Sequence, residues 1–111
     1  MHPAFEVHGG QTAVIALSGQ LDARSAARTR QDFVGAVAAG YPRLVVDLAA
    51  VDFIDSSGLS SLISGLKAAR LAGGDLRIAR PSAHVVTLLK MTQLERVMRS
   101  YASVEEALVG Y

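Results

Sequence analysis

The chain has 111 residues, which fits one domain, and 50% of them are apolar, so a hydrophobic core can form without crosslinks. Cysteine is absent, which excludes disulfides and thiol chemistry and is consistent with a reducing cytoplasm. The net charge of +1 and the few aromatic residues argue against nucleic-acid binding, and no apolar run is long enough to span a membrane. These properties predict one soluble, cytoplasmic domain over residues 1–111.

Two short strands and a loop open the predicted fold. Residues 4–8 and 12–17 have the composition of strands, and the Gly9-Gly10 pair between them is a turn signal, so the two segments are expected to form a hairpin. Residues 18–22 follow with Ser, Gly, Gln and Asp among them, and this composition predicts a loop.

The middle of the chain predicts a helix, a strand and a second helix. Apolar side chains recur on one face of residues 24–39, and Gly40 is a stop signal for that helix. Residues 43–48 are almost entirely apolar, as in a central strand covered on both faces. From residue 57 to residue 70, Leu and Ile recur at helical spacing and form one buried stripe.

The last third of the chain predicts one strand and two further helices. Residues 75–79 alternate as a short strand does, and Pro81 marks the start of the next helix. A short apolar segment near Val97 comes next, and Ser103 with Glu106 forms a capping box for a final helix. The order β-β-α-β-α-β-α-α predicts an α/β sandwich, in which a small mixed sheet of about four to five strands packs with about four helices.

The stretch 53–59, F-I-D-S-S-G-L, lies where the central strand passes into the second helix. A hydroxyl at that position, Ser56, can be exposed and chemically modified. The alternative is structural: Asp55 and Ser56 cap the free N–H groups of the first helical turn, and Gly58 eases the turn. Capping residues of this kind are common, so the motif alone leaves both interpretations open.

The second helix carries small polar side chains where long charged ones are usual. Ser60, Ser61 and Ser64 are expected on its exposed face beside Gly65, where they would form a flat strip next to the modifiable hydroxyl. Such a strip suits the docking of another protein. The alternative is that these small residues pack closely under the third helix or a loop.

Phosphorylation of Ser56 is expected to change docking strongly. A phosphate adds roughly −1.5 to −2 charges and bulk, and its repulsion from one fixed carboxylate about 7 Å away amounts to about 1–3 kcal/mol after solvent screening. That corresponds to about a 5- to 150-fold loss of affinity. The helix N-terminus would partly stabilise the phosphate in the free protein, so the modified chain could stay folded and bind poorly.

Two motifs together resemble those of a known family. The stretch 53–59 resembles the phosphorylation-site signature of the bacterial anti-sigma factor antagonists, the founding members of the STAS domain family. Residues 17–22, L-S-G-Q-L-D, resemble that family's Leu-x-Gly-x-Leu-Asp motif. The resemblance runs from about Phe5 to Leu108 and implies a STAS-like sandwich. One departure is Ser60, where many family members have Gly, and this difference bears on partner choice.

The resemblance implies a role for each residue of these motifs. The phosphate acceptor would be Ser56, and Asp22 and Asp55 would lie close to it and to the surface of the partner. The residues expected to bind the partner are Asp22, Asp55, Ser57, Gly58, Ser60, Ser61 and Ser64.

By the same resemblance, the partner is an anti-sigma factor that is also a serine kinase. The unmodified antagonist binds this kinase and frees the sigma factor, phosphorylation of Ser56 stops the binding, and a Ser/Thr phosphatase restores it. The chain itself would then not be an enzyme and would need no cofactor. It would contact neither nucleic acid nor membrane directly, and it would be a monomer or a weak dimer.

Two other functions compete with this one. A stand-alone STAS domain can also serve as a docking subunit of a membrane transporter ATPase or of a signalling scaffold, with its Ser unmodified. Hydrolysis by Ser56, Asp55 and His84 is disfavoured, because the chain has no Gly-x-Ser-x-Gly elbow. The histidines His2, His8 and His84 are scattered without ligand spacing, so no metal site is predicted.

Overall fold

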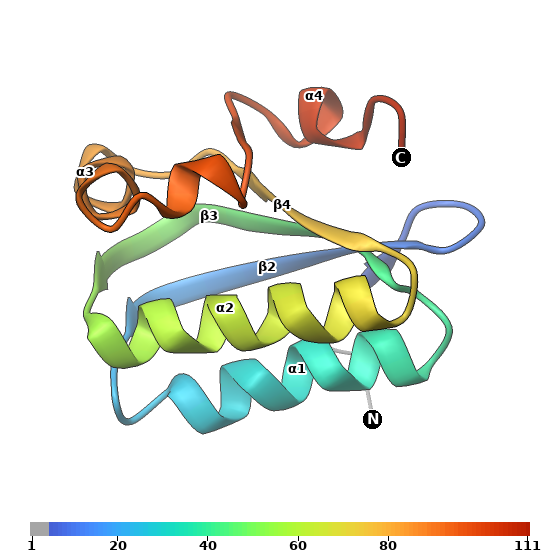
Figure 1. Ribbon diagram of the computed structural model, residues 1–111, viewed down its shortest axis with the longest axis horizontal. Coiled ribbons are helices and arrows are strands. Elements are labelled where there is room, and N and C mark those ends of the chain that lie inside the picture. Colours follow the sequence, from blue (N-terminus) through green and yellow to red (C-terminus); the bar gives the residue numbers. More distant parts are fainter. Residues whose placement is uncertain (1–4) are drawn as a thin grey trace.

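A five-stranded mixed sheet forms the centre of the protein. The computed structural model describes residues 5–111 and orders the strands β1-β2-β3-β4-β5 (Figure 1). The first two strands are antiparallel, and every other pair of neighbours is parallel. The strands are β1 (Glu6–Val7), β2 (Thr12–Leu21), β3 (Arg43–Ile54), β4 (Asp75–Ala79) and β5 (Ser100–Tyr101).

Helices cover both faces of this sheet. Two long helices lie side by side on one face, and the C-terminal helix lies on the other (Figure 1). The helices are α1 (Ala26–Ala38), α2 (Ser56–Leu71), α3 (Ala83–Met91), the 3₁₀ helix η1 (Leu94–Arg96) and α4 (Val104–Leu108). The predicted α/β sandwich is therefore confirmed. Within residues 5–111, no helix is both long enough and apolar enough to cross a bilayer.

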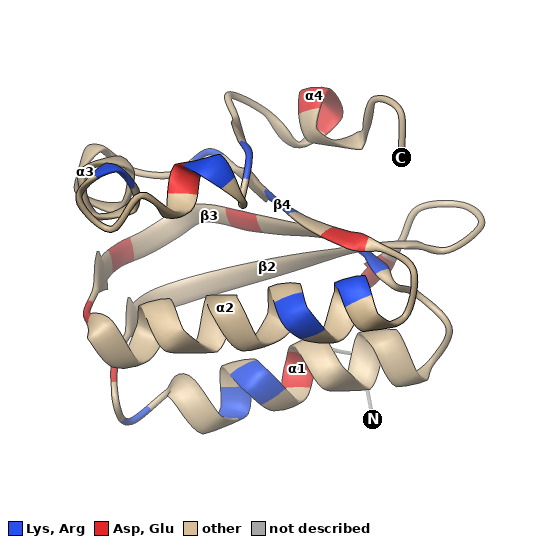
Figure 2. Ribbon diagram, viewed as in Figure 1, with Lys and Arg blue, Asp and Glu red and all other residues tan. Residues whose placement is uncertain are grey.

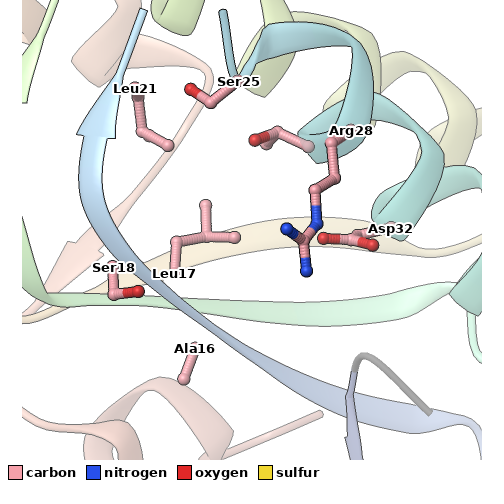
Figure 3. A pocket seen from close by; sticks show the side chains of 8 residues that line it. Ala16, Leu17, Ser18, Leu21, Ser25, Arg28 and Asp32 are labelled. Atoms are coloured by element: carbon pink, nitrogen blue, oxygen red, sulfur yellow. The ribbon is translucent and has the colours of Figure 1, made fainter. Parts of the chain in front are cut away.

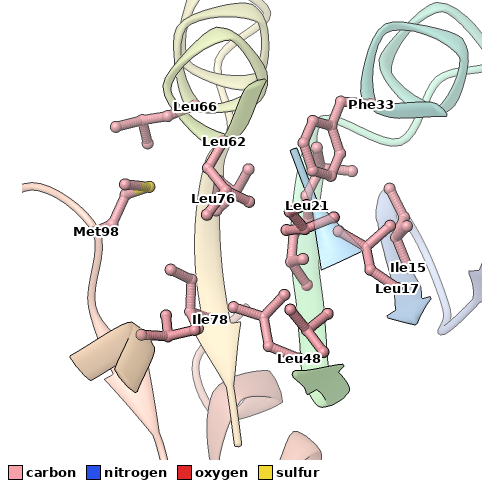
Figure 4. Close-up of a cluster of buried hydrophobic side chains, with 14 of the residues drawn as sticks. Ile15, Leu17, Leu21, Phe33, Leu48, Leu62, Leu66, Leu76, Ile78 and Met98 are labelled. Atoms are coloured by element: carbon pink, nitrogen blue, oxygen red, sulfur yellow. The ribbon is translucent and has the colours of Figure 1, made fainter. Parts of the chain in front are cut away.

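The main hydrophobic core lies between the sheet and the pair α1 and α2 (Figure 4), and it also includes Val85 and Leu89 of α3. Successive side chains of a strand point to opposite faces, so every second residue of the apolar run in β3 enters this core. These residues are Leu44, Val46 and Leu48. Phe33 of α1 and Leu62 of α2 meet them from the helices, and both are fully buried. Val45 packs on the opposite face, which confirms that this strand is covered on both sides.

The opposite face of the sheet is closed by the C-terminal segment. The guanidinium of Arg77 in β4 lies 4.0 Å from the centre of the Tyr111 ring. It also donates hydrogen bonds to the carbonyl oxygens of Ala107, at 2.9 Å, and Val109, at 2.6 Å. The Tyr111 hydroxyl in turn donates to the carbonyl oxygen of Leu44 at 2.9 Å. Arg77 and Tyr111 thus tie the end of the chain to the sheet.

The two long strands run further than the sequence pattern predicts. The expected loop over residues 18–22 is wrong, because residues 18–21 continue β2 beside the extended end of β3. Their pairing is irregular on both sides of Ser18 and Gly19. Gly19 has a φ of +79°, which a residue without a side chain adopts at low cost. Polar residues in an irregular strand have the composition of a loop, and this explains the error.

The remaining differences concern the ends of elements. α1 begins at Ala26, two residues later than predicted. Ser103 caps α4 as predicted, because its hydroxyl accepts a hydrogen bond from the Glu106 N–H at 3.0 Å. The two-residue strand β5 is too short to produce a periodic pattern, so the sequence does not reveal it. Residue 4 of the predicted first strand and His2 lie outside the described residues.

Candidate functional site

Parallel pairing of β2 and β3 brings the two sequence motifs together. Leu21 and Ile54 are paired at the carboxyl ends of these strands, so the residues that follow them emerge at the same edge of the sheet. The backbone N–H of Asp55 donates to the carbonyl oxygen of Leu21 at 3.1 Å, which continues the pairing by one residue. Asp22 and Asp55 therefore leave the sheet side by side, next to the N-terminus of α2.

Asp55, and not Ser56, caps α2. The Asp55 backbone is extended, and its carboxylate accepts a hydrogen bond from the Gly58 N–H at 3.0 Å. Ser56 is then the first residue of the helix, and its exposed hydroxyl makes no hydrogen bond to any residue from 5 to 111. The structural alternative therefore holds for Asp55 and fails for Ser56, whose side chain is left free at the surface.

Gly58 is required by the close approach of α2 to the end of β2. A Cβ atom on this residue would lie 2.1 Å from the carbonyl oxygen of Leu21, and a backbone atom cannot move away as a flexible side chain can. Gly58 is buried at this contact. It shapes the site by letting α2 start close to the sheet, and it has no side chain to present to a partner.

The predicted strip of exposed serines is wrong at one position. Ser61 is fully buried, and its hydroxyl donates to the carbonyl oxygen of Gly58 one turn earlier. It shares this buried side of α2 with Gly65, where a Cβ atom would lie 2.4 Å from the Phe33 ring. Small residues thus allow α2 to pack closely, as in the alternative drawn from the sequence, although the neighbour is α1 and not the third helix.

What remains exposed on the first turns of α2 is small and uncharged. Ser60 is exposed, and Ser57 and Ser64 are half-buried. The first charged side chain of the helix is Lys67, so the N-terminal half of α2 carries no charge (Figure 2). The surface around the Ser56 hydroxyl is consequently low and open on the side of the helix.

Asp22 lies at this edge of the sheet, but its carboxylate is already engaged. It accepts hydrogen bonds from the backbone N–H groups of Arg24, at 3.0 Å, and Ser25, at 3.3 Å, and it lies 3.5 Å from the Arg24 guanidinium. These contacts close the turn between β2 and α1. Asp22 therefore has a structural role here, in addition to its predicted place at the edge of the docking surface.

Two aromatic rings that the sequence did not assign to partner binding lie beside the site. Phe53 remains 42% exposed, and its ring stacks on His84, with 5.6 Å between the ring centres and 15° between the planes. His84 Nε2 lies 3.2 Å from the carbonyl oxygen of Ile54. This bond directs Nε2 to the backbone. Hydrolysis would need a hydrogen bond between His84 and Ser56, and within residues 5–111 the two side chains make none. The one sequence feature that could have pointed to this pair is Phe53, an aromatic residue two positions before the Asp55 cap.

A small polar cavity lies between β2 and α1, behind the Asp22 turn (Figure 3). Its volume is about 190 Å³, and Ser18, Ser25, Arg28 and Asp32 are among its lining residues. Burial raises the pKa of the Asp32 carboxyl, and the positive charge of Arg28 partly counteracts this effect. The carboxyl and the guanidinium offset one another, so the cavity is no strong anion site. Among residues 5–111 there is also no group of three His, Asp or Glu side chains that could hold a metal ion.

Comparison with known proteins places this arrangement in context. A family model described as the STAS domain matches residues 2–107 of the chain. The chain is 32% identical over 69 residues to a candidate anti-sigma factor antagonist of Thermotoga neapolitana. These residues are 62% of this chain and 61% of that protein, so the match spans less than two thirds of the relative's length.

Solved structures share the fold over nearly the whole chain. An anti-sigma factor antagonist from Mycobacterium paratuberculosis gives a TM-score of 0.82 at 28% identity, over 94% of this chain and 87% of that one. SpoIIAA of Bacillus in its unphosphorylated form gives 0.79 at 25% identity, over 94% and 90%. A sulfate transporter family protein from Wolinella succinogenes gives 0.79 at 15% identity, over 93% and 86%, which is a likeness of fold alone.

Proposed function

The chain belongs to the STAS domain family, and on this premise we propose that it is an anti-sigma factor antagonist switched by phosphorylation of Ser56. The unphosphorylated protein binds an anti-sigma factor that is also a serine kinase, and thereby frees the sigma factor. Phosphorylation by that kinase ends the binding, and a Ser/Thr phosphatase restores it. The proposal is supported by the relatives that carry this name and by an anti-sigma factor antagonist of the same fold at 28% identity.

The observation that carries the proposal is that Asp55 and Ser56 have different roles. The helix cap is supplied by Asp55, so the Ser56 hydroxyl has no structural task and is exposed at the first position of α2. A kinase can reach such a hydroxyl without unfolding the helix. The neighbouring surface of α2 is uncharged and carries short side chains, which leaves room for a partner to approach closely.

A phosphate at Ser56 can be accommodated by the free protein. The backbone N–H groups of Ser56 and Ser57 make no hydrogen bond within residues 5–111, and the N-terminus of a helix favours negative charge. In a complex the same phosphate must lose its water and fit under the partner, beside the carboxylate of Asp55. A coupling of about 1–3 kcal/mol is typical of such a switch and corresponds to a 5- to 150-fold loss of affinity.

The test is the intact mass of the protein after incubation with ATP and each candidate anti-sigma kinase of the same genome. A gain of one phosphate is expected in the wild type and in Ser57→Ala, and none in Ser56→Ala. The phosphorylated form should bind the kinase 5- to 150-fold more weakly than the unmodified form. An unchanged mass in the presence of a stable complex would overturn the proposal and favour a docking subunit of a transporter or scaffold.

A further inference from the structure

We propose that Phe53 and His84 form the second half of the docking surface and contact the anti-sigma factor together with the first turn of α2. This inference rests on the proposed function and adds the chemistry of the contact. Phe53 is the last but one residue of β3, two residues before the Asp55 cap, whereas His84 belongs to the first turn of α3. The stacked pair therefore extends the surface around Ser56 across a second element, α3, which is distant in sequence.

The packing of Phe53 does not explain why its ring is exposed. Its neighbours Val51 and Ile54 are buried in the main core, whereas Phe53 is 42% exposed, with the His84 ring stacked on one side of it. Aromatic side chains, Phe among them, are enriched at protein interfaces relative to the rest of the protein surface. A partner that covers Phe53 would remove its ring from water in the same event that covers Ser56.

The chemistry of His84 defines what the partner must offer. A carbonyl oxygen only accepts hydrogen bonds, so the Nε2 atom that faces Ile54 carries the hydrogen. In the neutral ring, Nδ1 is then an acceptor, and it makes no hydrogen bond within residues 5–111. The side chain is exposed. The contact surface of the partner should therefore combine an apolar side chain, placed on Phe53, with an N–H donor directed at Nδ1.

The test measures affinity for the kinase that phosphorylates Ser56 in the mass assay. Phe53→Ala and His84→Ala are each expected to weaken binding of the unphosphorylated protein by about tenfold. Two controls remove other exposed apolar side chains: Val34→Ala on α1, 53% exposed, and Met91→Ala at the end of α3, 75% exposed. Both controls should bind within twofold of the wild type, and thermal melts verify that every variant is folded.

A conservative variant separates recognition by His84 from a purely structural role. The side chain of His84→Gln keeps a hydrogen-bond acceptor, so this variant should bind within threefold of the wild type, whereas His84→Ala should not.

If Phe53→Ala and His84→Ala both bind the kinase as tightly as the wild type does, this inference is overturned and the phosphorylation switch is left intact. Binding of His84→Gln as weak as that of His84→Ala would overturn the role of Nδ1. A wild type that no candidate kinase binds or phosphorylates would overturn the proposed function and this inference with it.

Discussion

The face of the sheet beneath α1 and α2 is held by large apolar side chains, whereas the opposite face is held by a few polar ones. On the first face, the core contains fully buried residues such as Phe33 and Leu62, which come from two long helices. On the second face, the apolar cluster is small and α4 has only five residues. There the chain is secured by Arg77 and Tyr111.

This difference separates two ways of specifying structure. The face covered by α1 and α2 is built from repeated apolar residues. Many side chains therefore contribute to its stability, and their pattern is visible in the sequence. The other face depends on individual long-range contacts, such as that from Arg77 to the carbonyl oxygen of Val109. A change on the first face should matter most where packing leaves no space, and a change on the second face where one side chain makes several contacts.

The largest effect is expected from Gly58→Ala, at the most crowded point of the α2 face. The new Cβ would lie 2.1 Å from the carbonyl oxygen of Leu21, so α2 must move away from the sheet. We expect a loss of about 2–4 kcal/mol in the free energy of unfolding, measured by urea denaturation, as for overpacked core sites.

Gly35→Ala is the matched control for this change, because a Cβ there would meet nothing within 4 Å. Alanine is favoured over glycine inside a helix, so this variant should be more stable by up to about 1 kcal/mol. Equal stability of the two variants would show that α2 is not held tightly against the end of β2.

An intermediate effect is expected on the other face from Arg77→Met, which keeps an unbranched side chain and removes the charge. Two hydrogen bonds to backbone carbonyls and the contact with Tyr111 would be lost, at a cost of about 1–3 kcal/mol. Hydrogen exchange should accelerate in residues 104–111 and stay unchanged in α1 and α2.

The control for this prediction is Arg43→Met, since Arg43 is exposed at the start of β3. Its stability should stay within about 0.5 kcal/mol of the wild type. Acceleration of exchange throughout the protein in Arg77→Met would mean that the two faces unfold as one unit, and the contrast between them would disappear.

The smallest effect is expected in the pH dependence of stability on the second face. Burial alone would raise the pKa of the Asp47 carboxyl, but hydrogen bonds from Arg80 and the Ala49 N–H, together with the Arg80 charge, hold it below its usual value. The folded protein therefore keeps this carboxylate ionised at pH values where the unfolded chain takes up a proton. The resulting stability is present above the unfolded pKa of about 3.9 and is lost as the pH falls through the lower folded value.

Melting temperatures measured between pH 7 and pH 2.5 test this link. Asp47→Asn should be less stable than the wild type at pH 7 and should lose less stability on acidification. Parallel pH profiles for the two proteins would show that Asp47 and its partner Arg80 do not help to stabilise this face.

Much of the candidate site could be predicted from the chain, because its motifs are local. The D-S-S-G sequence indicates a strand end, a capped helix and an accessible hydroxyl within a few residues. Only the backbone conformation shows which residue of the motif caps α2, since the side chains of Asp55 and Ser56 can both act as a helix cap. The exposed strip also needed the structure: Ser61 has the same composition signal as Ser60, and only the rotation of α2 against α1 shows which is buried.

The sequence by itself determined the order of the elements apart from η1 and β5, the central apolar strand and the predicted position of an exposed hydroxyl, because periodicity and capping chemistry act between residues close along the chain. Only the tertiary structure decided how Asp22 and Asp55 leave the sheet side by side, that Phe53 stacks on His84, and that Arg77 holds the last residues on the sheet. The physical reason is that these contacts depend on strand register and helix packing. Register and packing are set by the whole core and leave no local pattern to read.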